Sequence, residues 1–116
     1  MYEKLPINLV TVVNATASGE GNYVETAPGG NLPGETRARI FLNVTALTAG
    51  TAPTMNVTIV ALVGGVDQLI VAFTQSTEGT SQQSVIVEGC PRSLKVEYVA
   101  GGTVADFDAT VDIIRF

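Results

Sequence analysis

The fold of this chain is decided by the stretch Ala38-Arg39-Ile40-Phe41-Leu42-Asn43-Val44-Thr45-Ala46. Small or aliphatic residues occupy every second position, and Arg, Phe, Asn and Thr stand between them. A period of two places alternate side chains on opposite faces of an extended strand, whereas a helix needs a period of about 3.6. The stretch therefore predicts a strand with one buried face.

The same alternation recurs along most of the chain. In residues 106–113 the apolar positions are Phe107, Ala109, Val111 and Ile113, and residues 93–98 alternate in the same way. Further strands are predicted over 7–15, 54–63, 68–75 and 83–88, with a short one near 23–26 and turns at 49–53, 64–67, 77–80, 89–91 and 100–102. Seven or eight short strands predict an all-β single domain over 1–116, an antiparallel β-sandwich or jelly roll.

Residues 17–36 break this rhythm. They hold five of the 12 glycines and two of the five prolines. A long loop of this kind in a compact domain is usually functional or disordered. We expect this loop and an N-terminal arm, residues 1–6, to contact a partner, although a merely mobile loop is the alternative.

Composition excludes several chemistries. The 116 residues include no histidine and one cysteine, so a Ser-His-Asp triad, a His-ligated zinc site and an intrachain disulfide are impossible. The chain has only six Lys and Arg residues and a net charge of −5, which argues against nucleic-acid binding. No activated nucleophile is visible, so we expect no enzymatic activity, cofactor or metal. Cys90 is predicted to be structural and unreactive.

The acidic residues Asp106, Asp108 and Asp112 share one predicted strand face. Carboxylates at such spacing can ligate Ca²⁺, but a solvent-facing, charge-solubilised strand is the favoured interpretation. A paired-carboxylate glycosidase site is disfavoured because nothing indicates a cleft. The opening residues do not resemble a signal peptide, and the apolar run 59–66 is too short to span a bilayer. We therefore expect neither export nor a membrane partner.

The order of strands and turns resembles small β-sandwich virion proteins of tailed bacteriophages, and most closely the capsid decoration (cement) proteins. The resemblance covers residues 41–116 and rests on Phe41-Leu42-Asn43-Val44-Thr45-Ala46-Leu47, then Gly50-Thr51-Ala52-Pro53-Thr54-Met55-Asn56-Val57-Thr58-Ile59, Leu69-Ile70-Val71-Ala72-Phe73-Thr74-Gln75, Leu94-Lys95-Val96-Glu97-Tyr98 and Gly101-Gly102-Thr103. It carries over no defined functional residues. The absence of Trp leaves a tail or baseplate component open.

The resemblance implies a non-enzymatic structural protein of the virion. Such a protein binds the outer surface of the capsid, bridges neighbouring subunits of the major capsid protein, often forms a homotrimer, and is assembled in the host bacterial cytoplasm. Residues expected to contact the capsid or another partner are Tyr2, Lys4, Tyr23, Leu32, Arg37 and Arg39. The alternative function is a carbohydrate-binding or adhesin-type module, whose sites favour exposed aromatic side chains beside polar groups.

The Gly64-Gly65 turn predicts that residues 54–63 and 68–75 pair as a hairpin. If Val63 lies opposite Leu69, a core face collects Met55, Val57, Ile59, Ala61, Val63, Leu69, Val71 and Phe73. The opposite face then carries a patch of Val60, Leu62, Ile70 and Ala72, which we predict to be an oligomer interface. The alternative is that the 17–36 loop folds back over this patch.

Overall fold

The computed structural model describes residues 6–26, 36–48, 51–77 and 79–116, and the protein is built from strands throughout these ranges. The strands are β1 (Ile7–Ala15), β2 (Gly19–Glu20), β3 (Val24–Glu25), β4 (Ala38–Thr48), β5 (Thr51–Val63), β6 (Val66–Ala72), β7 (Ser81–Val87), β8 (Ser93–Thr103) and β9 (Asp106–Arg115). No helix long and apolar enough to cross a membrane is found among these described residues.

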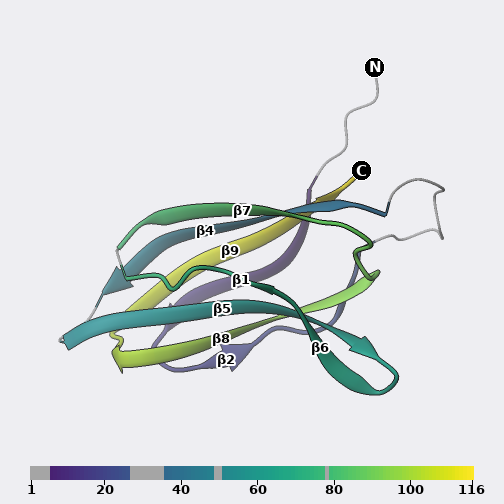
Figure 1. The fold of residues 1–116 in the computed structure, drawn as a ribbon. Helices are drawn as coiled ribbons and strands as arrows, with labels where there is room; N and C mark the ends of the chain where they lie inside the picture. Colours follow the sequence, from purple (N-terminus) through teal and green to yellow (C-terminus); the bar gives the residue numbers. More distant parts are fainter. Residues whose placement is uncertain (1–5, 27–35, 49–50, 78) are drawn as a thin grey trace.

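Two antiparallel sheets form the two layers of the molecule (Figure 1). Their strand orders are β1-β9-β4-β7 and β2-β8-β5-β6. Strand β3 pairs with β8 as β2 does, at residues 93–94 rather than 97–98, so β2 and β3 share one edge position. Apart from β2–β3 and the β5–β6 hairpin, every connection leads from one sheet to the other. This is the order of a jelly roll, and the predicted fold class is confirmed.

The core lies between the two sheets and follows the predicted alternation closely. All four apolar positions of β9, from Phe107 to Ile113, are at most 3% exposed. On β4, the buried side chains are Ala38, Ile40, Leu42 and Val44, as predicted. The opposite sheet contributes Met55, Val57, Ile59, Ala61, Leu94 and Val96. Because each strand presents one apolar face, the two sheets bury these faces against each other.

One predicted core position of β4 is wrong. Val44 pairs with Ala109 but Ala46 pairs with Asp108, so Thr45 is an extra residue on β4. Such a β-bulge reverses the face of every later side chain on its strand. Ala46 therefore leaves the core face, and Leu47 takes its place at 4% exposure.

Two predicted turns lie partly inside strands. Strand β8 runs through Gly101 and Gly102, and β5 already begins at Thr51. The two strands pair here with a register shift that places Ala52 and Pro53 opposite Gly102. A bulge tolerates proline, which has no N–H to donate, and Gly102 adopts a φ of +65° that suits glycine. The pairing therefore continues where the Gly and Pro residues predict a break.

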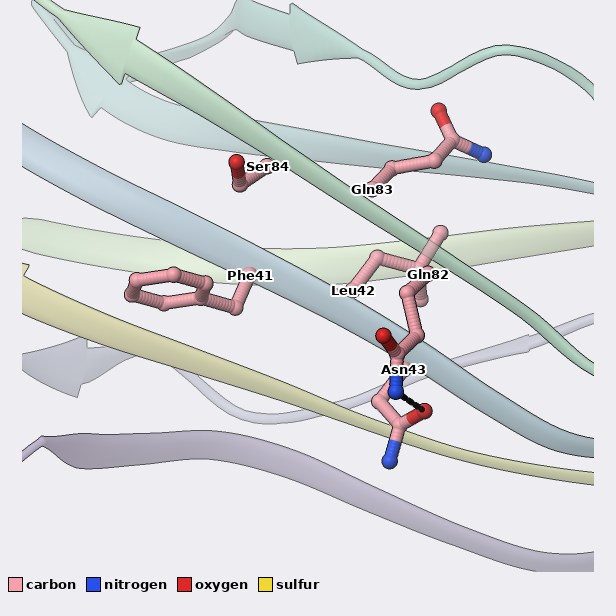
Figure 2. A pocket seen from close by; sticks show the side chains of 6 residues that line it. All are labelled: Phe41, Leu42, Asn43, Gln82, Gln83 and Ser84. Carbon is pink, nitrogen blue, oxygen red and sulfur yellow. Dashed lines mark hydrogen bonds between the residues drawn. The ribbon is translucent and has the colours of Figure 1, made fainter.

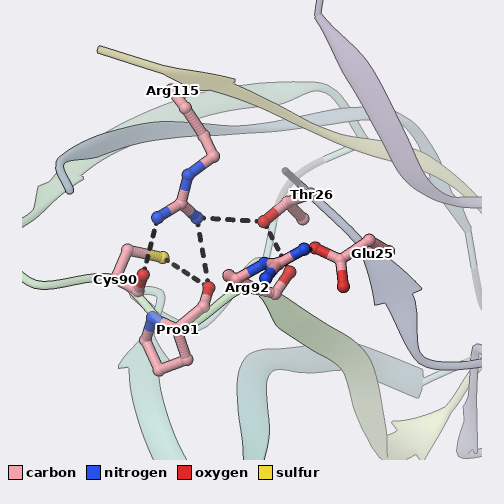
Figure 3. A network of polar contacts seen from close by, with 6 residues as sticks. All are labelled: Glu25, Thr26, Cys90, Pro91, Arg92 and Arg115. Carbon is pink, nitrogen blue, oxygen red and sulfur yellow. Dashed lines mark hydrogen bonds and ion pairs between the residues drawn. The ribbon is translucent and has the colours of Figure 1, made fainter. Parts of the chain in front are cut away.

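A buried arginine joins three segments at one end of the sandwich (Figure 3). The guanidinium of Arg115 on β9 donates hydrogen bonds to Thr26 Oγ1 (2.9 Å) and to the carbonyl oxygens of Cys90 (2.7 Å) and Pro91 (3.1 Å). Arg115 is 8% exposed. These bonds satisfy carbonyl groups of the β7–β8 turn, and they fix that turn and the end of β3 to the last strand.

Cys90 belongs to the same cluster. It is 5% exposed, and its thiol donates to the Pro91 carbonyl oxygen at 3.5 Å. Burial raises the pKa of the Cys90 thiol, although the neighbouring Arg115 charge acts in the opposite direction. A buried thiol with a raised pKa stays protonated at neutral pH. The structure therefore agrees with the predicted structural role.

Candidate functional site

The first candidate surface is the apolar end of the β5–β6 hairpin, which extends beyond the rest of the sandwich in Figure 1. Gly64 and Gly65 have φ values of +61° and +80° and form a two-residue turn. Four side chains beside this turn are more than half exposed: Leu62 (55%), Val63 (52%), Val66 (58%) and Leu69 (62%). We call these four residues the hairpin tip. In the register of the hairpin, Leu62 and Leu69 lie on its outer face, whereas Val63 and Val66 lie on the opposite face. The two pairs therefore flank the turn from both sides.

The predicted register of this hairpin is wrong. Val63 lies opposite Val66 across the two-residue turn, rather than opposite Leu69. Further from the turn, Val60 pairs with Leu69 but Ile59 pairs with Val71, so β6 carries one extra residue, Ile70. The bulge places Val71 in the core, as predicted, but turns Leu69 outward. Phe73 is also buried, as predicted, and its N–H bonds to the Val57 carbonyl.

The register shift at Ile70 also changes the predicted oligomer patch, because its four residues differ in exposure. Val60 is 6% exposed, and Ile70 is half-buried against the core. Leu62 and Ala72 are exposed. Val60 and Ile70 are therefore not exposed in the single chain, contrary to the expected apolar surface, and the assignment of this patch as an oligomer interface stays a prediction. Sequence reasoning missed Val63, Val66 and Leu69, although two consecutive glycines are a known signal for a two-residue turn.

Tyr23 joins the 17–26 segment to the end of this hairpin near the turn, because its partner Asp67 lies between Val66 and Leu69. Its hydroxyl donates a hydrogen bond to the Asp67 carboxylate on β6. Lys95 on β8 lies 5.1 Å from the centre of the Tyr23 ring and forms ion pairs with Glu20 (3.3 Å) and Asp67 (3.4 Å). Tyr23, predicted to contact a partner, thus contacts its own chain. We call Tyr23, Asp67, Lys95 and Glu20 the clasp.

The clasp lies beside Val60 and shifts the pKa values of Tyr23 and Asp67. Lys95 pairs with Val60 across β8 and β5, so both side chains share the outer face, where Val60 is 6% exposed. The hydrogen bond raises the pKa of Tyr23 and lowers the pKa of Asp67, because it favours the protonated phenol and the ionised carboxylate. Residues 20 and 23 of the 17–36 segment thus contact β6 and β8, while residues 27–35 lie outside the described residues, so covering of the patch by this loop stays a prediction.

The second candidate surface is the outer face of the β1-β9-β4-β7 sheet. Phe41, half-buried on β4, lies in register between Ser84 on β7 and Asp112 on β9. The next row places Asn43 between Gln82 and Thr110, and the Gln82 side-chain amide donates to Asn43 Oδ1 at 3.5 Å (Figure 2). Asn8 on β1 donates to Asp112 Oδ1 at 2.9 Å. We call these seven residues the polar face: Asn8, Phe41, Asn43, Gln82, Ser84, Thr110 and Asp112.

Two shallow hollows of about 360 and 530 Å³ follow the β4–β7 part of this face. The first is lined by residues 41–43 and 82–84 and the second by residues 43–45 and 80–82. The surface thus combines an aromatic side chain with amide, hydroxyl and carboxylate groups. Only the pairing of β4 with β7 and β9 brings these residues together, and no local sequence signal indicates it.

The acidic residues of β9 lie on this outer face, as predicted from the alternation with buried neighbours. Asp108 accepts a hydrogen bond from the Asn14 backbone N–H at 2.6 Å. Desolvation and a hydrogen bond with Asp108 raise the pKa of Asp106. Within the part of the chain that the structure describes, no group of three or more His, Cys, Asp or Glu residues could hold a metal ion.

The remaining predicted contact residues belong neither to the hairpin tip nor to the polar face, although Arg39 lies on the same outer face as Phe41. The Arg37 guanidinium lies 4.6 Å from the centre of the Phe116 ring, and Arg39 is exposed on β4. Tyr2, Lys4 and Leu32 lie outside the described residues. Contact of these five residues with a partner stays a prediction.

Comparison with known proteins identifies solved structures with a similar fold. No family model and no curated protein matches the chain. It is similar in structure to endo-1,4-β-D-xylanase 10B of Clostridium thermocellum, which was solved as its CBM22-1 and GH10 modules with xylohexaose. The sequence identity is 12%, the match covers 97% of this chain and 29% of that chain, and the TM-score is 0.52. The C-terminal domain of the sugar-binding protein EclA is also similar, at 12% identity over 98% of this chain and 80% of that one, TM-score 0.48. At such identities the likeness to the xylanase shows a shared β-sandwich fold and nothing finer.

Proposed function

We propose that this protein is a non-catalytic structural protein that attaches to another protein through its hairpin tip. The observation that carries the proposal is the exposure of four large apolar side chains, each more than half accessible, at one protruding turn. Exposed apolar residues gathered on both faces of one protruding turn offer a partner protein apolar surface to bury. The absence of histidine from the sequence removes the commonest catalytic base and supports a binding role over an enzymatic one.

The role proposed is the one that the sequence resemblance implies, a decoration protein on a phage capsid with the major capsid protein as its partner. A jelly roll is compatible with this role, because the fold serves both in viral capsids and in lectins. Fully burying a side chain such as Leu contributes about 1.5–3 kcal/mol. Four half-exposed residues therefore offer several kcal/mol when a partner covers them, part of which offsets the cost of association.

Co-sedimentation with capsids assembled without this protein tests the proposal. Leu69→Asp places a charge in the hairpin tip and should abolish co-sedimentation, while circular dichroism stays β-rich. Val13→Asp is the matched control, because Val13 on β1 is 65% exposed but remote from the tip. This control should bind as the wild type does. Failure of the wild-type protein to sediment with capsids, or equal binding by Leu69→Asp, would overturn the proposal.

A second candidate function is carbohydrate binding at the polar face. The specific observation in its favour is Phe41, flanked across the sheet by amide, hydroxyl and carboxylate groups that suit sugar hydroxyls. The xylanase chain that contains a similar fold was solved as two modules in complex with xylohexaose. Retention of the protein on immobilised neutral polysaccharides tests this function, and passage through all of them unretained argues against it.

A further inference from the structure

The polar face differs from an all-polar sheet surface in one respect, because it carries the aromatic ring of Phe41 among hydrogen-bonding side chains. Its central row runs Ser84, Phe41, Asp112 and Asn8 across all four strands. Neighbouring strands lie about 4.8 Å apart, so the row spans about 14 Å. A half-buried aromatic ring at the middle of such a row offers an apolar surface for the C–H face of a sugar ring.

The polar groups around Phe41 supply the complementary hydrogen bonds. The amides of Asn43 and Gln82 each donate and accept, and their mutual bond of 3.5 Å is long enough to be exchanged for bonds to a ligand. The Asp112 carboxylate receives one bond from Asn8 and keeps acceptor capacity for ligand hydroxyls. The hollows along β4 and β7 lie directly beside these groups.

The charged side chains on the outer face of the β1-β9-β4-β7 sheet indicate which charge class of sugar it favours. Asp106, Asp108 and Asp112 stand on the outer face of β9, and the cation Arg39 stands on the outer face of β4. Asp112 is the one charged member of the polar face and lies opposite Phe41, so acidic saccharides such as uronates would meet repulsion there, while Asp106 and Asp108 lie further along β9. Uncharged sugars meet only the hydrogen-bonding groups and the ring.

We infer that the polar face binds an uncharged oligosaccharide laid across β7, β4 and β9, with Phe41 stacking on one sugar ring and Asn43, Gln82 and Asp112 bonding its hydroxyls. The inference rests on the second candidate function and deepens it by naming the site and the charge class of the ligand. Phe41 and Asp112 are register partners on adjacent strands, so a single sugar ring can reach both.

Titration calorimetry with defined hexasaccharides tests the inference. The probes are xylohexaose, cellohexaose and mannohexaose as neutral sugars, hexagalacturonate as an anion and the chitosan hexamer as a cation. At least one neutral probe should bind, and hexagalacturonate should bind at least about tenfold more weakly, a difference of about 1.4 kcal/mol. Phe41→Ala and Gln82→Ala should each weaken the neutral probe by about tenfold. Ile86→Ala, on the same face of β7 but outside the polar face, is the matched control and should change affinity less than about twofold.

The outcomes separate the site from the function. Binding of none of the five probes overturns both the inference and the second candidate function. Binding that Phe41→Ala and Gln82→Ala leave unchanged overturns the assigned site while carbohydrate binding stands. Tightest binding by hexagalacturonate or by the chitosan hexamer overturns the charge class.

Discussion

The two ends of the β5–β6 hairpin contain the same kinds of residue in opposite surroundings. At the base, Met55, Val57, Ile59 and Ala61 are at most 2% exposed, while the four residues of the hairpin tip are all more than half exposed. The base packs against the β1-β9-β4-β7 sheet, and the tip extends past it. Apolar character therefore contributes to folding at one end and remains available to a partner at the other.

The largest effect expected from this contrast comes from truncating one residue at each end. Ile59→Ala leaves a cavity in the core and should lower the free energy of unfolding by about 2–5 kcal/mol. Leu69→Ala removes a side chain that is 62% exposed and should cost no more than about 0.5 kcal/mol. Urea unfolding followed by circular dichroism measures both. Similar losses for the two variants would mean that the tip is already packed in the free protein, which would remove the argument for a partner there.

A smaller effect is expected at the turn between the two strands. Gly65 has a φ of +80°, and a Cβ added there would meet no atom within 4 Å. Gly65→Ala should therefore cost about 1–2 kcal/mol from backbone conformation alone. Gly64→Asn is the control, because Asn-Gly is the favoured pair for a two-residue hairpin turn, and it should stay within about 0.5 kcal/mol of the wild type. An alanine variant as stable as the asparagine variant would show that this turn is not held in the left-handed conformation.

The hairpin also shows how far the sequence predicts the structure. Alternation correctly predicted the buried faces of β4 and β9, because those strands pair with few irregularities and pack against one core. It failed at Ala46, Ile70 and Leu69, because a single extra residue in a bulge reverses the face of every side chain beyond it on the strand. No local pattern marks Thr45 or Ile70 as the extra residue, since bulge position depends on how the paired strand is arranged. The polar face escaped prediction for a similar reason: Phe41, Ser84 and Asp112 become neighbours only through long-range pairing.

The smallest effect concerns the clasp beside the hairpin tip, and it depends on pH. Because the pKa of Asp67 is lowered in the folded protein, its bond to Tyr23 adds stability above the ordinary carboxyl pKa of about 3.9. That stability is lost as pH falls through the lower, folded value. The raised pKa of Tyr23 has the opposite sign, so its contribution is present below about pH 10 and is lost as pH rises through the folded value.

Tyr23→Phe should therefore unfold at a slightly lower temperature than the wild type, by a margin that is constant between about pH 5 and 9. The margin should shrink toward about pH 2 and again above about pH 10, because at either extreme the wild type loses the same bond that the variant lacks. Tyr98→Phe serves as the control, since Tyr98 packs against Phe107 and takes no part in the clasp. A difference in unfolding temperature that persists unchanged down to about pH 2 would contradict this account. It would show that the Tyr23 ring, through its contact with Lys95, holds this end of the hairpin, and that the Tyr23 hydroxyl does not. The hairpin tip would then stay in place at any pH, and its attachment to a partner should lose no strength on acidification through this route.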